Sequence, residues 1–549
     1  MIAKKDNKTV ATNSTIARRD EQVGGEVMAQ QLVETVHVVF KTHLDIGFTD
    51  FARNVVEQYH TRFIPQALAT ARALRERGGA ERMVWTTGSW LIYEHLEQAG
   101  AEARHRLEQA IGDGDIAWHG LPFTTHTELM DPALFEFGLG MSAELDRRFG
   151  KQTIAAKMTD VPGHTRGMVP LLAAAGIQFL HIGVNPSSRP PDVPPVFVWQ
   201  DPSGASVVVM YQRGSYGELM VVPWLADAIA FAHTNDNQGP QSPEQVIANF
   251  EHLRAQLPGA RVVASTLDAF ARKLLVIKDQ LPVVRAELGD TWIHGAGSDP
   301  WKIARFRELQ RLRSHWLVSG EVQADDEHVK AFSRHLIMVP EHTWGLDEKT
   351  FLADEQTYDA PSFGAARPTP RFHMMEESWL EQRGYLDAAL SALGDTTQGQ
   401  EAQRAVAALV PGLPDFSTFE RVDDPEAPIE TAHFQLHFDP RHGSITQLTH
   451  KATGRHWFDD QHPLALVRYQ TFGRAEYDRF WRQYNINKRT TAVWSIPDFT
   501  KPGIETALQS GAEWLPVLDG LYHRYDGKRH QFIADLRMPE ESSMQFGAP

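Results

Sequence analysis

Several polar side chains in the first three hundred residues have the types and spacing that metal binding requires. His43 and Asp45 come directly after the apolar run 36-VHVVF-40, Asp160 follows another apolar run, and His294 belongs to a third. Alternate residues of an extended loop project to the same side, so His43 and Asp45 can chelate one ion. Two imidazoles and two carboxylates together form a ligand set for Zn²⁺ or another borderline divalent ion.

The same residues also have simpler structural interpretations. Asp45 can cap a helix that begins near Gly47, while His43 is a hydrogen-bonded loop residue. Asp160 in front of a helix is likewise an ordinary N-cap. Because short motifs match by accident, His43-Leu44-Asp45 by itself favours the structural interpretation. The decision rests on the elements that would bring these residues together.

Apolar runs alternate with helical patterns from residue 36 to about residue 300. Such runs, buried on both faces, predict a parallel sheet covered by helices, in the form of a barrel or a doubly wound sheet. In these folds functional groups lie beyond the carboxyl ends of the strands, so we expect the loops of His43, Asp160, Asp236 and His294 to meet in one pocket. The predicted strands are 36–40, 82–88, 115–120, 153–158, 179–184, 206–211, 228–233, 262–266 and 291–295.

The chain divides into segments of different character. Residues 1–33 are polar and predict a disordered arm, and 34–299 form the α/β catalytic domain. Residues 300–410 carry amphipathic helical patterns that predict a helical bundle. Residues 411–430, rich in Pro, Asp and Glu, predict a linker. Apolar residues then alternate with period two, so 431–549 is expected to be an antiparallel β-sandwich that is incomplete at its end.

Composition excludes several classes of protein. The 549 residues carry a formal net charge of −16, which gives no basic surface for nucleic acid. Cysteine is absent, so any metal must be held by histidines and carboxylates. Neither an apolar signal segment nor a run long enough to span a membrane is found, which predicts a soluble cytoplasmic protein without a membrane partner. A homo-oligomer stays open.

Two stretches resemble glycoside hydrolase family 38, the retaining α-mannosidases. The stretch 43-HLDIGF-48 is similar to the family's histidine–x–aspartate–x–glycine–aromatic signature, and 160-DVPGHTRGMVPLL-172 is similar to its nucleophile loop. The resemblance spans most of the chain from residue 36 at the level of motifs, which points to a divergent branch. It implies a multidomain α/β protein with an N-terminal (β/α)7-type barrel, a central helical bundle and a C-terminal antiparallel β-sandwich.

The resemblance also implies a role for each matching residue. His43 and Asp45 would be metal ligands, and Asp160 would be both a ligand and the catalytic nucleophile. His294 takes the place of the second ligand histidine, although the sequence of its loop departs from the family's usual motif. Asp236 falls where the acid/base aspartate is expected. The implied cofactor is one divalent metal, Zn²⁺ before Co²⁺ or Ca²⁺, and the implied substrate is an α-mannoside.

This division of labour is chemically consistent. Retaining hydrolysis needs two carboxyl groups about 5–5.5 Å apart, one to attack the anomeric carbon and one to protonate the leaving oxygen. A metal-bound Asp160 would stay ionised because the cation stabilises its charged form. Asp236, off the metal and near another carboxylate, would have a raised pKa and so act as acid and then base.

Further polar and aromatic residues are candidates for substrate contacts. Some follow predicted strands, and others lie in 340-PEHTWGLDEKTF-351, which interrupts the helical region with more polar groups than a plain turn needs. Structural hydrogen bonding and aromatic packing are the alternative interpretations. The candidates are His119, His126, Glu128, Asp299, Trp301, His342, Trp344 and Asp347.

Two other functions compete with a metal-dependent retaining α-glycosidase. A carbohydrate de-N-acetylase also holds a metal with His and Asp, but such enzymes usually add two ligand histidines four residues apart on a helix. The predicted catalytic domain has no His-x-x-x-His. A non-catalytic carbohydrate-binding relic of a hydrolase would have no need for both Asp160 and Asp236. The glycosidase is therefore favoured.

Overall fold

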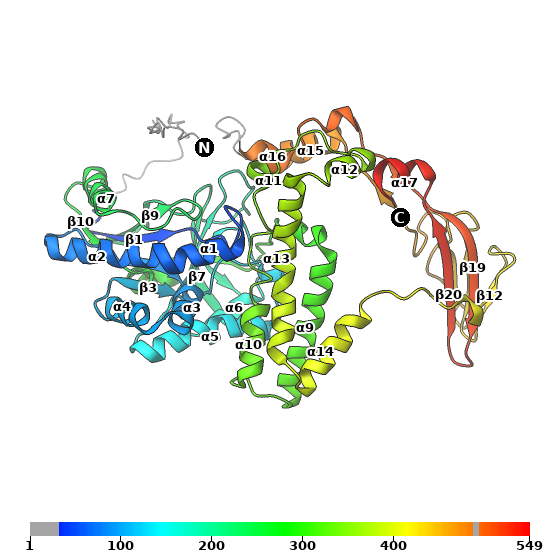
Figure 1. Ribbon diagram of the computed structural model, residues 1–549, viewed down its shortest axis with the longest axis horizontal. Coiled ribbons are helices and arrows are strands. Elements are labelled where there is room, and N and C mark those ends of the chain that lie inside the picture. The colour runs from blue at the N-terminus through cyan, green and yellow to red at the C-terminus, as the bar shows by residue number, and fades with distance from the viewer. Residues whose placement is uncertain (1–31, 487–493, 549) are drawn as a thin grey trace.

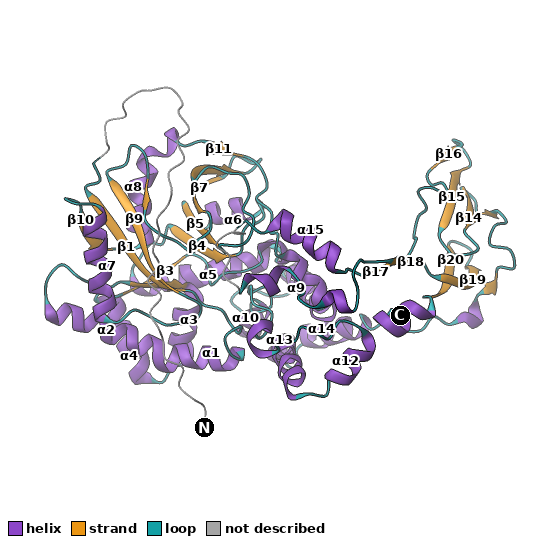
Figure 2. Cartoon of the chain, turned by 90° about the horizontal axis from the view of Figure 1, so that it is seen from above, coloured by secondary structure: helices purple, strands orange, loops and turns teal. Residues whose placement is uncertain are grey.

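The computed structural model describes residues 32–486 and 494–548, and its elements fall into three regions (Figure 1). An α/β region occupies one end of the molecule, long helices stand in the middle, and small antiparallel sheets lie at the other end. The view from above shows the same order (Figure 2). The N-terminal arm predicted for residues 1–33 lies almost wholly outside the described residues.

The first sheet is built around β1, which is buried along its whole length. β2, β9 and β10 all run parallel to β1, with β10 beside its first half and β2 beside its second half. Burial on both faces explains why β1 is an almost continuous apolar run. In order, the sheet contains β3 (Ile116–His119), β2 (Trp85–Gly88), β1 (Thr35–Thr42), β9 (Asp227–Thr234) and β8 (Met220–Val221), with β10 (Arg261–Ala264) on β1.

The second sheet is mixed, because β4, β5 and β7 are parallel and β6 is antiparallel to β7. It adjoins the first sheet where Gly120 N–H donates to the Ala155 carbonyl at 2.9 Å. Residues of both sheets share one apolar cluster, which includes Val39, Val208 and Ile229. The order is β11 (Val283–Val284), β6 (Val196–Gln200), β7 (Ser206–Gln212), β5 (Phe179–Val184) and β4 (Ala155–Asp160).

These strands confirm a multidomain α/β protein but not the expected closed barrel. Within the described ranges the strands of residues 32–299 form two separate sheets. The last predicted strand is also wrong, because Ile293–Ser298 form the 3-10 helix η4. There Trp292 N–H donates to Asp290 Oδ1 at 2.8 Å and Gly295 N–H to the Trp292 carbonyl at 3.0 Å, so the chain turns instead of extending.

Helices cover the outer faces of the two sheets. Helix α6 begins at Met168, and Pro170 lies in its first turn, where it is tolerated. The helices are α1 (Ala52–Gln58), the π-helical η1 (Tyr59–Phe63), α2 (Ile64–Arg77), α3 (Ser89–Gln98), α4 (Ala101–Gly112), η2 (Thr127–Leu129), α5 (Pro132–Phe149), α6 (Met168–Ala174), α7 (Pro243–Gln256), α8 (Leu267–Leu274) and η3 (Leu275–Gln280).

The central region consists of helices, as the amphipathic patterns predict. Asp299 caps α9 by accepting a hydrogen bond from Lys302 N–H at 3.1 Å. None of the helices in the described ranges is long and apolar enough to cross a membrane. The long helices are α9 (Pro300–Ser319), α10 (Glu327–Leu336), α13 (Pro370–Leu393) and α14 (Thr397–Ala408), and the shorter α11 (Glu348–Phe351) and α12 (Ala360–Ala366) lie between α10 and α13.

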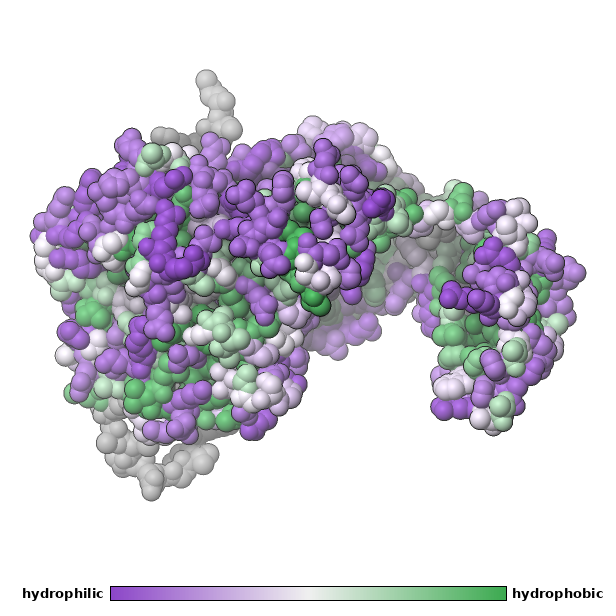
Figure 3. Space-filling view, turned by 90° about the horizontal axis from the view of Figure 1, so that it is seen from below, coloured by the Kyte–Doolittle hydropathy of each residue, from purple (hydrophilic) through white to green (hydrophobic). Residues whose placement is uncertain are grey.

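The C-terminal region has the predicted antiparallel strands, gathered in small sheets that form a separate lobe (Figure 3). Leu436, Phe438 and Leu521 form its core. Its helices α15, α16 and α17 were not predicted. The strands are β12 (Glu420–Arg421), β13 (Ile429–Glu430), β14 (Phe434–Phe438), β15 (Ile445–His450), β16 (Arg455–His456), β17 (Tyr469–Gln470), β18 (Glu513–Trp514), β19 (Val517–Tyr525) and β20 (His530–Arg537). The short helical segments are η5 (Phe416–Thr418), α15 (Arg474–Tyr484), α16 (Ser495–Phe499), η6 (Ile504–Thr506) and α17 (Glu540–Phe546).

Gly163, between Asp160 and α6, has no room for a side chain. A Cβ atom there would lie 1.7 Å from the Gly289 carbonyl oxygen, so Gly163→Ala must move backbone. We expect it to lower the free energy of unfolding by roughly 1–3 kcal/mol, measured by thermal and urea unfolding. The control is Gly140→Ala in α5, where a Cβ meets nothing within 4 Å and the stability should rise by about 0.5–1 kcal/mol. Equal stability of the Gly163→Ala and native chains would contradict the close backbone approach.

Candidate metal and catalytic site

Loops from three strands and one segment of the helical region meet beyond the carboxyl ends of β1, β4 and β9. The segment of the helical region is the loop 340–347, which lies between α10 and α11. Its Pro340 carbonyl accepts from His126 N–H at 2.8 Å, its Gly345 carbonyl accepts from Phe48 N–H at 3.0 Å, and Asp347 N–H donates to the Phe48 carbonyl at 2.9 Å. These backbone bonds fasten the segment into the α/β region.

Four buried side chains converge at this meeting point. Asp45 Oδ1 lies 3.0 Å from His43 Nε2 and 3.1 Å from His342 Nε2. The two Nε2 atoms are 3.2 Å apart, and Asp160 Oδ2 lies 3.8 Å from His342 Nε2. Ligand atoms of His43, Asp45 and His342 all lie within 4.8 Å of one another.

The charges of this cluster depend on one another. Burial acts to lower the pKa of both histidines, but neighbouring carboxylates outweigh it and raise the pKa of His43 and, much further, that of His342. Burial acts to raise the pKa of Asp45, and the two histidines overcome it, so the pKa of Asp45 falls well below its usual range. The geometry therefore stabilises positive charge between the carboxylates, as protons on imidazole or as a metal ion.

The donor set fits a divalent ion. Asp45 Oδ2 and Asp160 Oδ1 are buried, and neither has a hydrogen-bond partner among the described residues. Buried carboxylate oxygens are normally satisfied, so two orphaned ones beside two facing imidazoles favour a bound cation. Imidazole nitrogens with carboxylate oxygens are ligands that Zn²⁺ accepts. His43, Asp45, Asp160 and His342 would hold the ion.

A second layer of side chains orients His342. Glu341 Oε1 lies 2.7 Å from His342 Nδ1, and both residues are fully buried. The other Glu341 oxygen accepts from the amide and the hydroxyl of Thr343. A carboxylate that takes the distal ring N–H of a ligand histidine fixes its tautomer and makes Nε2 a better metal ligand.

Asn237 holds the loop that carries His43 and Asp45. Its side-chain amide donates to the Asp45 carbonyl at 3.0 Å and to Thr49 Oγ1 at 2.8 Å, while its Oδ1 accepts from Asp45 N–H at 3.1 Å. Asn237 has a φ of 51°, a left-handed conformation that Asn tolerates better than most residues. The neighbouring Asp236 is thereby tied in place beside the metal loop.

Asp160 and Asp236 face a common phenol, that of Tyr216. The Tyr216 ring lies 4.8 Å from the His43 ring. Burial and the charges of Asp160 and Asp236 raise the pKa of Tyr216 well above its usual value, and its hydroxyl interacts with both carboxyl groups. Burial and the charge of Asp45 raise the pKa of Asp236 to about 6. Asp160 has a φ of 78°, a strained conformation typical of functional positions.

His294 is not part of this cluster. It is exposed on η4, and its Nδ1 lies 3.0 Å from the Thr291 carbonyl oxygen. The expectation that it would be the second ligand histidine depended on a strand over 291–295, and that strand does not form. His342, expected to touch substrate, lies in the cluster with His43 and Asp45 instead.

The other candidates for substrate contacts are dispersed. His126 is buried between Asp290 (2.6 Å) and Trp344 Nε1 (3.1 Å) and orients the Trp344 ring. His119, the last residue of β3, is buried, and its Nε2 lies 3.4 Å from the Lys41 amine.

The rest have structural partners. Asp299 caps α9 and forms an ion pair with Arg383 at 2.8 Å, and Asp347 caps α11. The Glu128 side chain accepts a hydrogen bond from Asp290 N–H. The Trp301 ring packs against the Arg305 guanidinium.

Sequence patterns give little signal for Glu341 and Tyr59. Tyr59 belongs to a helical segment, yet its hydroxyl donates to the His43 carbonyl at 3.1 Å. Glu341 directly precedes His342, and only the general need of a ligand histidine for a carboxylate partner points to it.

Zinc binding should depend on His342 and Glu341 and not on His294. We expect Glu341→Gln to weaken Zn²⁺ binding about 10–100-fold, because the ligand histidine loses its carboxylate partner, and His342→Ala to weaken it further. The measurement is calorimetric titration of metal-free protein with ZnCl₂. His294→Ala is the matched control and should leave the affinity unchanged. Loss of binding in His294→Ala alone would reverse the assignment.

Comparisons with known proteins agree with this architecture. A family model described as a domain of unknown function (DUF5054) matches residues 296–549, and no curated protein matches the sequence. An α-mannosidase from Enterococcus faecalis V583 shares the fold with a TM-score of 0.56 at 10% identity, over 92% of this chain and 71% of that one. A glycosyl hydrolase family 38 protein from Enterococcus faecalis matches with a TM-score of 0.49 at 9% identity, over 90% of this chain and 65% of that one. The chain therefore has a fold like that of an α-mannosidase.

Proposed function

We propose that the protein is a metal-dependent retaining α-glycosidase that acts on α-mannosides. The observation that supports this proposal most directly is the buried cluster in which His43, Asp45 and His342 converge beside Asp160, with the protonatable Asp236 close by. The likeness in fold to an α-mannosidase supports the same reaction class.

Each residue of the cluster has a part in this proposal. A divalent ion held by His43, Asp45, Asp160 and His342 would bind sugar hydroxyls and so orient the ring for attack. One oxygen of the Asp160 carboxylate would help to hold the ion, and the other is available for attack; its Oδ2 lies 3.8 Å from His342 Nε2. The Tyr216 hydroxyl interacts with the carboxyl groups of both Asp160 and Asp236.

The reaction would run in two displacements. The Asp160 carboxylate attacks the anomeric carbon while the glycosidic C–O bond breaks and Asp236 gives its proton to the leaving oxygen. Asp236, now a carboxylate, takes a proton from water, which attacks the glycosyl ester and releases Asp160. Protonated Asp236 is available for the first step because burial and Asp45 raise its pKa.

Hydrolysis of aryl α-mannosides tests the two roles separately. Asp160→Asn should reduce kcat roughly 10³-fold or more for every leaving group, because no glycosyl ester forms. Asp236→Asn should slow poor leaving groups far more than acidic phenols, which need no proton. His294→Ala is the control with full activity. If the native chain cleaves no aryl glycoside in the presence of Zn²⁺, Co²⁺ or Ca²⁺, the proposal is wrong.

The pH profile should report Asp236. Its acid form is required in the first step, so kcat/KM should fall as pH rises through its pKa of about 6. The Tyr216 hydroxyl acts to lower that pKa, so Tyr216→Phe should move the basic limb to higher pH. Initial rates of a mannoside with a poor leaving group measure the shift. A basic limb that stays in place would remove Tyr216 from this role.

A further inference from the structure

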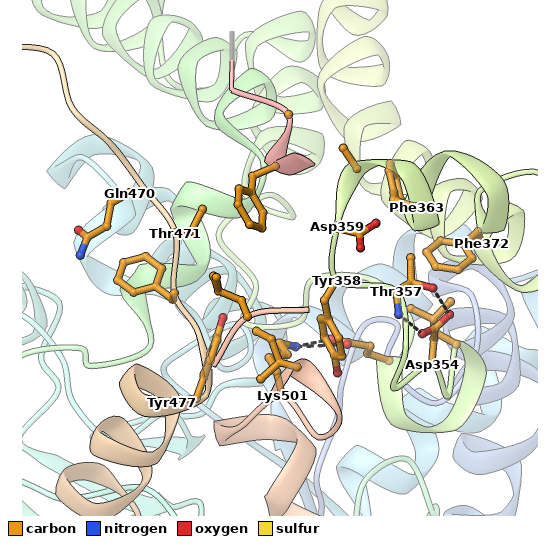
Figure 4. Close-up of a pocket in the computed structure, with 18 of the residues that line it drawn as sticks. Asp354, Thr357, Tyr358, Asp359, Phe363, Phe372, Gln470, Thr471, Tyr477 and Lys501 are labelled. Carbon is orange, nitrogen blue, oxygen red and sulfur yellow. Dashed lines mark hydrogen bonds and ion pairs between the residues drawn. The ribbon is translucent and has the colours of Figure 1, made fainter. Parts of the chain in front are cut away.

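A cavity of about 570 Å³ lies apart from the catalytic cluster, between the helical region and the C-terminal segments (Figure 4). Phe363 and Phe372 stand on one side of it, and Gln470, Thr471 and Tyr477 stand on the other. The volume falls within the range of about 300–1,000 Å³ that small-molecule sites occupy. Neither the catalytic mechanism nor the metal site uses these residues.

Aromatic rings that are partly exposed to solvent line the cavity. Phe363 is 42% exposed and packs edge to face on Phe372, with ring centroids 5.7 Å apart. Phe472, on the opposite side, is 51% exposed. Rings gathered from separate segments and left open to solvent mark a binding surface better than isolated exposed residues do.

The charged residues of the cavity are already neutralised or bonded. Asp354 accepts from two backbone amides and from the Thr357 hydroxyl, and Asp359 caps α12 through Ser362 N–H. Lys501 pairs with Glu348 at 3.3 Å. Within the described ranges the Gln470 amide and the Tyr477 hydroxyl have no hydrogen-bond partner. The cavity thus offers ring faces together with neutral donors and acceptors.

We propose that this cavity is a second saccharide-binding site, which holds a part of the glycan remote from the bond that is cleaved. A pyranose has apolar C–H faces for Phe363 and Phe372, and hydroxyl groups for Gln470 and Tyr477. A charged ligand would meet no unpaired opposite charge, and a purely apolar one would bury the two free polar groups at a cost. The inference rests on the proposed function.

One short helix connects the cavity to the catalytic site. Glu348 of α11 lines the cavity, while the next residue, Lys349, pairs with Asp347 at 2.8 Å and with Asp498 at 2.7 Å. The cavity residue Glu348 therefore directly follows the segment 340–347 that carries His342.

Saccharide titrations of the full chain test the proposal. The parent is Asp160→Asn, which cannot turn over, and the probes are methyl α-mannoside and a linear α-linked manno-oligosaccharide, measured by calorimetry. We expect Phe363→Ala to weaken oligosaccharide binding about tenfold and Tyr477→Phe about fivefold. Methyl α-mannoside at the catalytic site should bind unchanged. Trp457→Ala, which removes a 48% exposed ring outside the cavity, should also have no effect.

The outcomes separate this site from the proposed reaction. In chains with an intact Asp160, Phe363→Ala should raise KM for the oligosaccharide and leave aryl mannoside kinetics unchanged. Equal oligosaccharide affinity in the parent and in both cavity variants overturns the saccharide site, as does an oligosaccharide that binds nowhere. If no glycoside is hydrolysed but both cavity variants lose affinity, the reaction is wrong and the saccharide site stands. Tyr477→Phe keeps the ring, so its result does not depend on a folding defect.

Discussion

The charge balance between buried carboxylates and buried imidazoles is the constraint on which the rest of the structure depends. Asp45 and Asp160 stand beside two imidazoles, with almost no access to water, and such carboxylates are stable only next to compensating positive charge. The histidines supply that charge as protonated rings, or a divalent ion supplies it more fully. The supporting residues, Glu341 on His342 and Asn237 on the His43 loop, keep the compensation in place.

The sequence predicted well what short-range pattern determines. Strand β1 and the long helices follow from apolar periodicity. The rule that functional groups lie at strand ends brought His43, Asp45, Asp160 and Asp236 to one place, while their roles stay predictions. Periodicity does not say whether strands close into a barrel, since closure depends on how distant strands pair. The C-terminal helices, such as α15, were missed because turn and alternation signals in that region indicated strands.

His342 shows why the site was only partly predictable. It comes from a loop between helices, and its place beside Asp45 results from backbone bonds between Pro340–Asp347 and loops about two hundred residues or more away in sequence. No local pattern reports such bonds. His294 was chosen because its neighbours looked like a strand, whereas Asp290 and the glycines around it make a turn.

The fastening of Pro340–Asp347 into the α/β region has a consequence for biosynthesis. A nascent chain that has emerged only to residue 299 would hold His43, Asp45 and Asp160 but not His342. The candidate metal site would therefore be complete only after the helices α9 and α10 have left the ribosome, and the α/β unit transplanted alone would lack His342. A gene rearrangement that separated the α/β region from the helical region would remove His342 from the site. We therefore expect the two regions to be inherited together.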